Sequence, residues 1–210
     1  VYRICSMPPP SSGGIALIQM LNILENLDID KLQHNSEKYL MNLISAMDYA
    51  FFDRAKYLGD PDFFNVPQEL LISKQYAKDI STKIKNKEEL HKIKITVSES
   101  EETTHFSIVD KWGNAVSNTY TLNTAYGSGI VPTGTGILMN NEMDDFSSKP
   151  GYPNVYGLIG SEANKIEPKK TPLSSMTPVI VFKEDKPFLV TGSPGGSTII
   201  TAVLQELLNV

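Results

Sequence analysis

Hydrophobic positions in the first half of the chain recur at helical spacing. Apolar residues between positions 15 and 24 lie three or four apart, and Ser12 precedes them as a candidate N-cap. A second pattern of this kind covers residues 36–58 and ends at residues 59–61, Gly-Asp-Pro. Its predicted apolar stripe consists of Leu40, Leu43, Ile44, Met47, Ala50 and Phe51. A third helix is predicted over residues 73–85, so this half is expected to be mainly helical.

From residue 103 onward the pattern changes to the alternation typical of strands. Residues 104–110 and 115–121 flank a Trp-Gly-Asn turn, which predicts a β-hairpin. The other elements predicted here are strands at 137–140, 178–182 and 188–191, a turn at 184–186, and a helix from about residue 197. Helices followed by mostly antiparallel strands predict an α+β protein in which helices cover a sheet.

Composition narrows the range of partners. With 40% hydrophobic residues, 20% charged residues and a net charge of −5, the chain has the composition of an ordinary globular protein. It has no basic stripe of the kind that binds nucleic acid, and no apolar run of the roughly 18 residues that cross a bilayer. No cofactor motif or metal-ligand cluster is visible. The single cysteine, Cys5, is predicted to be a small buried hydrophobe.

Thr103 lies where a polar connector, residues 85–102, meets the first predicted strand. If the backbone were cut between Glu102 and Thr103, the new terminus would carry both a hydroxyl nucleophile and a free α-amine. Such an amine titrates near pH ~7.7–8.0, so it can accept a proton close to neutrality. Taken by itself, however, Thr103 fits an ordinary β-branched strand residue better than a nucleophile.

Several short motifs then suggest a family. They are residues 7–14 (MPPPSSGG), 57–63 (YLGDPDF), 103–107 (TTHFS), 140–146 (NNEMDDF), 172–176 (PLSSM) and 191–197 (TGSPGGS). With these motifs in this order, the chain resembles the γ-glutamyltransferase (glutathione hydrolase) family of N-terminal-nucleophile hydrolases over essentially its whole length. The resemblance implies a four-layer αββα sandwich, of which only a part is expected in this chain. Residues 1–102 would end the large subunit, and residues 103–210 would begin the small one.

The family motifs imply a role for each candidate site residue. Thr103 would be the cleavage site and the nucleophile, and an N→O acyl shift would break its bond to Glu102. Thr121 would orient the nucleophile. Gly195 and Gly196 would form the oxyanion hole, because glycine lets backbone N–H groups approach the substrate closely. The substrate-binding matches are Glu142 and Asp145 for the ammonium group, Asn123, Ser174 and Ser175 for the amino-acid end, and Tyr156 as the gate of a lid over residues 149–160.

The resemblance therefore implies a self-processing γ-glutamyl hydrolase and transferase that acts on glutathione through an ester on Thr103. After cleavage it would be a heterodimer of large and small chains, active in the periplasm or outside the cell. The alternatives are a glutaryl or cephalosporin acylase and a truncated, non-catalytic remnant or split-gene piece. Glu142 and Asp145 disfavour the acylase, because two carboxylates need a cation between them and a glutaryl group brings none. The family's carboxylate-binding arginine is expected from an earlier region, since neither Arg3 nor Arg54 lies in the matching motif.

Overall fold

A computed structural model of the protein describes residues 1–88, 90–91, 102–154 and 157–210. The helices are α1 Gly13–Asn26, α2 Glu37–Tyr57, α3 Gln68–Leu71, α4 Lys74–Lys85 and α5 Ile199–Leu208. The strands are β1 Tyr2–Ser6, β2 Thr104–Val109, β3 Ala115–Tyr120, β4 Val179–Lys183 and β5 Lys186–Thr191. Short 3₁₀ turns lie at Ile29–Lys31, Glu142–Asp145, Glu162–Asn164 and Gly196–Thr198. The predicted mixture of helices and antiparallel strands is confirmed.

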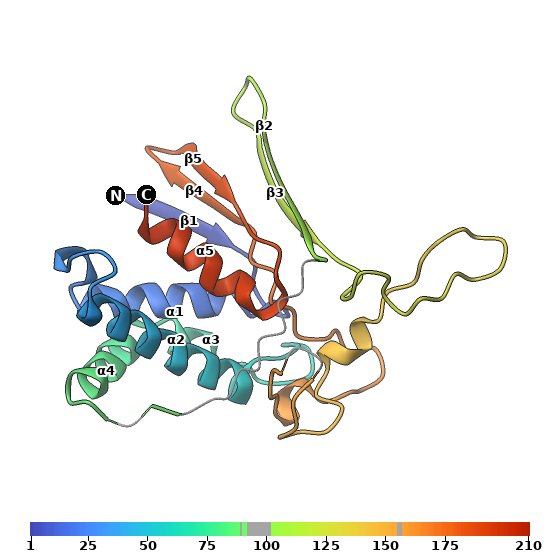
Figure 1. The fold of residues 1–210 in the computed structure, drawn as a ribbon, viewed down its shortest axis with the longest axis horizontal. Coiled ribbons are helices and arrows are strands. Elements are labelled where there is room, and N and C mark those ends of the chain that lie inside the picture. The colour runs from blue at the N-terminus through green and yellow to red at the C-terminus, as the bar shows by residue number, and fades with distance from the viewer. Residues whose placement is uncertain (89, 92–101, 155–156) are drawn as a thin grey trace.

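The strands form two antiparallel units (Figure 1). One is a three-stranded sheet in the order β1-β4-β5, and the other is the hairpin of β2 and β3. The apolar core joins Val179 and Val181 of β4 to residues of α1, α2, α4 and α5. Within this core α1 contacts β1, and α2, α4 and α5 pack against α1. Ser117 ties the hairpin to the sheet, because its Oγ donates to the Thr191 carbonyl at 2.8 Å and accepts from the Val179 N–H at 3.1 Å.

The helix boundaries follow local sequence signals closely. Ser36 and Ser73 cap α2 and α4, each accepting a hydrogen bond from the backbone N–H three residues later. Ser12 also precedes its helix, but its side chain does not cap α1. The Ser12 hydroxyl instead donates to the Ser174 carbonyl at 2.7 Å. Ser12, which was predicted to cap α1, therefore forms a tertiary contact between two distant segments instead.

The buried face of α2 differs from the predicted stripe. Leu40 and Ile44 are 40% and 50% exposed, so their assignment to the core was wrong. The residues that α2 buries are Tyr39, Leu43, Ser45, Ala46, Tyr49, Ala50, Phe51, Asp53 and Arg54. The prediction considered apolar side chains only, whereas the buried face continues through the polar Asp53 and the charged Arg54.

Two further predictions were wrong. Residues 137–140 do not form a strand, although Met139 exchanges backbone hydrogen bonds with Ser128 and Ile130 across a loop. Cys5 is exposed, because β1 is an edge strand whose alternation turns Ile4 toward the core and Cys5 away from it. The predicted turn between β4 and β5 is confirmed, and its residues Glu184 and Asp185 have positive φ angles.

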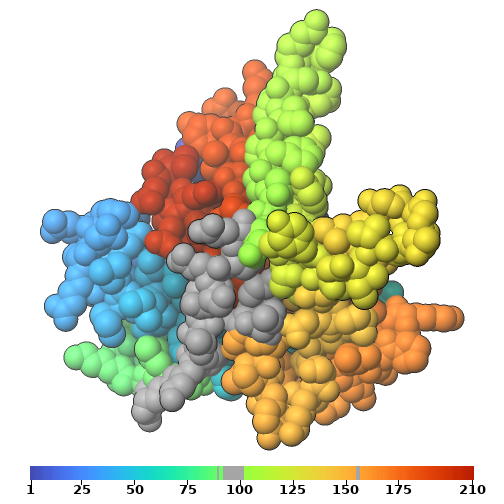
Figure 2. Space-filling model, turned by 45° about the vertical axis from the view of Figure 1, so that its right-hand side comes forward, coloured from blue at the N-terminus to red at the C-terminus, as the bar shows by residue number. Residues whose placement is uncertain are grey.

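The hairpin of β2 and β3 stands out from the body of the molecule as a column (Figure 2). Cross-strand partners share a face of a hairpin, so Ile108 lies beside Val116, and the Tyr120 face also carries Phe106. These four apolar side chains are all exposed. One face of the hairpin is therefore an apolar surface without a covering layer among the described residues.

Gly14 lies where the start of α1 crosses residues 7–12 at close range. A Cβ at this position would lie 2.3 Å from the Met7 carbonyl oxygen, a backbone atom that cannot rotate away. We expect Gly14→Ala to lower the free energy of unfolding by about 1–3 kcal/mol, measured by urea denaturation. Lys78→Ala, on the exposed side of α4, is the control and should change it by less than about 0.5 kcal/mol. Equal midpoints for the two variants would contradict this prediction.

Candidate active site

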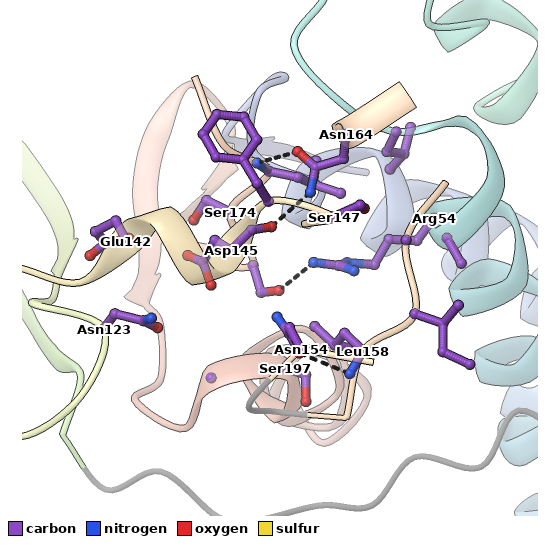
Figure 3. Close-up of a pocket in the computed structure, with 18 of the residues that line it drawn as sticks. Arg54, Asn123, Glu142, Asp145, Ser147, Asn154, Leu158, Asn164, Ser174 and Ser197 are labelled. Carbon is purple, nitrogen blue, oxygen red and sulfur yellow. Dashed lines mark hydrogen bonds between the residues drawn. The ribbon is translucent and has the colours of Figure 1, made fainter. Parts of the chain in front are cut away.

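One pocket brings together segments that lie far apart in the sequence (Figure 3). Its empty volume, open mouth included, is about 750 Å³. The predicted site residues in its lining are Thr103, Thr121, Asn123, Glu142, Asp145, Ser174, Ser175 and Gly196. Gly195 precedes Gly196 but does not line the pocket, and Glu102 is exposed beside Thr103. The predicted gate, Tyr156, lies outside the described residues.

Thr103 is buried at the start of the hairpin, with 7% of its surface exposed. Its Oγ1 donates to Thr121 Oγ1 at 3.4 Å, a long hydrogen bond. The Thr121 oxygen also accepts a bond from the Asn123 N–H at 2.9 Å. The Thr103 hydroxyl is therefore held inside the pocket, while Glu102, the residue before it, faces solvent.

Asn123 connects the end of β3 to the loop that carries the acidic residues. Its φ of 78° lies in the left-handed region, which asparagine tolerates better than most residues. Its side-chain amide donates to the Asn141 carbonyl at 3.3 Å, immediately before the 3₁₀ turn Glu142–Asp145. Asn123 thus fixes the distance between the hairpin and the carboxyl groups.

Glu142 and Asp145 place two carboxyl groups in the same wall of the pocket (Figure 3). Burial and the neighbouring Glu142 carboxyl raise the pKa of Asp145 to about 7, against the opposing effect of the Arg54 charge. Burial also raises the pKa of Glu142. Within the described residues no cation forms an ion pair with either group. A positively charged ligand between them would relieve this cost.

This pKa makes the stability of the ligand-free protein depend on pH. Because Asp145 holds its proton more tightly when folded, its contribution is complete at low pH and is lost as the pH rises through about 7. We expect the free energy of unfolding to fall between about pH 5 and about pH 8, and to fall less in Asp145→Asn. Urea titrations at both pH values measure this, with the exposed Asp62→Asn as control. An identical pH dependence in Asp145→Asn and the wild type would contradict the assignment.

The Ser174 and Ser175 segment is joined to residues 7–12 by reciprocal bonds. Ser12 N donates to the Ser174 carbonyl at 2.8 Å, and Ser174 N donates to the Pro10 carbonyl at 3.0 Å. Ser11 Oγ adds a bond to the Met176 carbonyl at 2.7 Å. Two motifs separated by more than 150 positions therefore form one rigid wall of the pocket.

Gly195 and Gly196 form a sharp turn ahead of α5. Their φ angles are 122° and 56°, and a Cβ on Gly195 would lie 2.6 Å from Thr198 Oγ1. Only glycine adopts the first of these conformations without strain. The turn brings Gly196 to the surface of the pocket.

Sequence reasoning missed Arg54, which projects from α2 into the same pocket (Figure 3). The side chain is only 5% exposed, and burial lowers its pKa to about 10. Its Nε donates to Ser12 Oγ and its Nη2 to Ser175 Oγ, both at 2.9 Å. The available signal was a charge four residues after Ala50, at helical spacing on the buried face.

Ser147 was also missed. It lines the pocket, and its buried Oγ has no hydrogen-bond partner in the described part of the chain. Gly160 packs directly against it, since a Cβ there would lie 1.9 Å from this oxygen. A serine in a predicted loop carries no pattern by which it could be found.

Two kinds of feature are absent from residues 1–88, 90–91, 102–154 and 157–210. None of the helices there is both long and apolar enough to cross a membrane. No three acidic, histidine or cysteine side chains in these ranges are grouped in a way that could hold a metal ion.

Comparison with known proteins identifies the family. A family model described as Gamma-glutamyltranspeptidase matches residues 1–210. The chain belongs to this family. A glutathione hydrolase proenzyme of Escherichia coli K12 is 55% identical over 213 residues, which cover 99% of this chain and 37% of the relative. The chain thus spans little more than a third of that γ-glutamyltranspeptidase relative.

Solved structures agree with this membership. A mutant of Helicobacter pylori γ-glutamyltranspeptidase is 64% identical with a TM-score of 0.50, over 51% of this chain and 57% of that one. A cephalosporin acylase from Bacillus halodurans is 26% identical with a TM-score of 0.74, over 99% of this chain and 35% of that one. The fold of this chain therefore matches a part of the γ-glutamyltranspeptidase structure and a part of the acylase structure.

Proposed function

We propose that this chain carries the nucleophile and the glutamyl-binding groups of a self-processing γ-glutamyl hydrolase and transferase. The observation that carries the proposal is that buried Thr103 lines one pocket with Glu142 and Asp145. Membership of the γ-glutamyltranspeptidase family and similarity to a glutathione hydrolase proenzyme support glutathione and related γ-glutamyl amides as substrates.

Self-cleavage would use the Thr103 hydroxyl in an N→O acyl shift. Its Oγ1 attacks the Glu102 carbonyl carbon, the peptide C–N bond breaks, and the nitrogen takes up a proton as the ester forms. Water then hydrolyses the ester, leaving a carboxylate on Glu102 and a free α-amine on Thr103. The exposure of Glu102 and the burial of Thr103 support this step, because the hydroxyl is enclosed next to a residue that solvent reaches.

Turnover would repeat the attack on an external amide. The Thr103 α-amine accepts the hydroxyl proton and passes it to the leaving amine, while the γ-glutamyl group is held as an ester. Thr121 orients the attacking oxygen through the bond that joins the two hydroxyls. Backbone N–H groups of Gly195 and Gly196 would stabilise the oxyanion, a contribution typically worth about 10²–10³ in rate. Water or an amino acid then takes the acyl group.

Substrate recognition would divide between two parts of the pocket. Glu142 and Asp145 would hold the α-ammonium of the glutamyl group, whose charge favours ionisation of both. Ser174, Ser175 and Asn123 would donate to the α-carboxylate. The gate at Tyr156, the full αββα sandwich, the heterodimer and a location outside the cytoplasm belong to the same proposal.

The test combines mass and turnover. We expect purified protein to show two fragments divided between Glu102 and Thr103, and to release p-nitroaniline from γ-glutamyl-p-nitroanilide. A glutaryl anilide tests the acylase alternative, which the similarity to the Bacillus halodurans enzyme makes worth including. Faster cleavage of the glutaryl compound would favour the acylase. An uncut chain without turnover of either compound would favour the remnant and overturn the proposal.

A further inference from the structure

Arg54 is a buried cation whose hydrogen bonds go to hydroxyl groups. It donates to Ser12 Oγ and Ser175 Oγ, and no carboxylate among the described residues lies within ion-pair distance of it. Asp145 is the acidic group that influences its charge from across the pocket. An arginine in this situation leaves positive potential in the pocket beside the acidic wall.

The two serines that Arg54 contacts differ in whether the hydroxyl hydrogen is already donated in a hydrogen bond. A serine hydroxyl carries one hydrogen to donate and two positions to accept. The Ser12 hydroxyl donates its hydrogen to the Ser174 carbonyl. Ser175 accepts from Arg54, and its own hydrogen has no acceptor within the described ranges. Because Ser175 lines the pocket, this hydrogen is available to a bound ligand.

We propose that Arg54 is a positioning residue that makes Ser175 the donor to the α-carboxylate of a glutamyl ligand. Arg54 occupies the accepting side of the Ser175 oxygen and so turns its hydrogen away from α2. A cationic donor also polarises the hydroxyl and strengthens the bond that the hydroxyl gives. The inference rests on the proposed function, because it assumes a glutamyl group in this pocket.

The arrangement matches the chemistry of an amino-acid α-carbon. Its ammonium and carboxylate groups are attached to the same atom, so their binding sites must be neighbours. Asp145 and Arg54 both line this pocket (Figure 3), and the hydroxyl that accepts the Arg54 hydrogen bond belongs to Ser175, which lines it too. The pocket therefore combines a carboxyl group for the ammonium with a hydroxyl donor, backed by a cation, for the carboxylate.

The test compares two ligands that differ only in the α-carboxylate: L-glutamate and 4-aminobutyrate. Isothermal titration calorimetry measures their Kd values for wild type, Arg54→Met, Arg54→Lys and Ser175→Ala. We expect Arg54→Met to raise the Kd of L-glutamate about 10- to 100-fold and to leave that of 4-aminobutyrate unchanged. Arg54→Lys should restore part of the affinity because it keeps the charge.

Ser175→Ala provides an independent arm if Arg54→Met does not fold. It should weaken L-glutamate selectively, and adding Arg54→Lys to it should have little further effect, because both act on one bond. Equal losses for both ligands, or an unaltered L-glutamate Kd in Ser175→Ala, would overturn the positioning role. Failure of the wild type to bind L-glutamate would instead refute the proposed function.

Discussion

Replacing Thr103 with alanine leaves the purified protein uncut and lowers γ-glutamyl anilide turnover on the order of 10⁴-fold or more. The change removes the single oxygen that would attack both the Glu102 carbonyl and the substrate. It removes little else, since the hydroxyl makes one long hydrogen bond within the described residues, to Thr121. Intact-mass spectrometry measures the cleavage, and release of p-nitroaniline measures the turnover.

Control variants distinguish the loss of the nucleophile from a disturbance of the surrounding structure. Thr103→Ser keeps a hydroxyl and should still cleave itself, although more slowly. Thr104→Ala alters the neighbouring exposed threonine and should leave both readouts unchanged. Thr121→Ala should reduce the rates only partly, because Thr121 orients the attacking oxygen. Self-cleavage by Thr103→Ala would show that another group attacks the bond.

Replacing Asp145 with asparagine raises the Kd of L-glutamate by at least about 30-fold and leaves the Kd of glutarate unchanged. The two ligands differ only in the α-ammonium, which L-glutamate carries and glutarate lacks. The neutral amide removes one of the two charges that would hold this ammonium. It also removes a carboxyl group whose ionisation is disfavoured by burial in the empty pocket.

Titration calorimetry of both ligands at about pH 8, above the pKa of about 7 of Asp145, measures this difference. Asp144→Asn is the matched control, because it changes a carboxylate on the same 3₁₀ turn that does not line the pocket. Equal loss of both ligands would mean that Asp145 acts only on the structure. Tighter wild-type binding of glutarate than of L-glutamate would point to the acylase.

The elements that sequence reasoning predicted well are those set by neighbours in the chain. The Ser36 and Ser73 caps and the β2–β3 hairpin depend on residues a few positions apart. The alternation at residues 137–140 has the same local form, yet no partner strand pairs with it within the described residues, and it remains a loop. A strand needs a partner, which its own sequence does not specify.

The candidate site was predicted through its motifs, and the contacts between those motifs were not. The resemblance indicated Thr103 and Asp145, which the fold brings to one pocket. The place of Arg54 in the site was not predicted, because its hydrogen-bond partners lie 42 and 121 positions away in the chain. Arg54 lies on a helix, where a charged side chain is usually exposed. It lines the pocket because α2 packs against residues 7–12 and 172–177, and this packing is seen only in the structure.

The uncovered hairpin has a practical consequence for every measurement on this polypeptide. Among the described residues β2 and β3 pair only with each other, so their outer edges offer backbone donors and acceptors next to the apolar side chains of Phe106 and Ile108. Such edges recruit further strands from other molecules. Self-association will therefore grow with concentration, and titrations should be run at several dilutions, with light scattering recorded alongside, so that ligand binding is separated from aggregation.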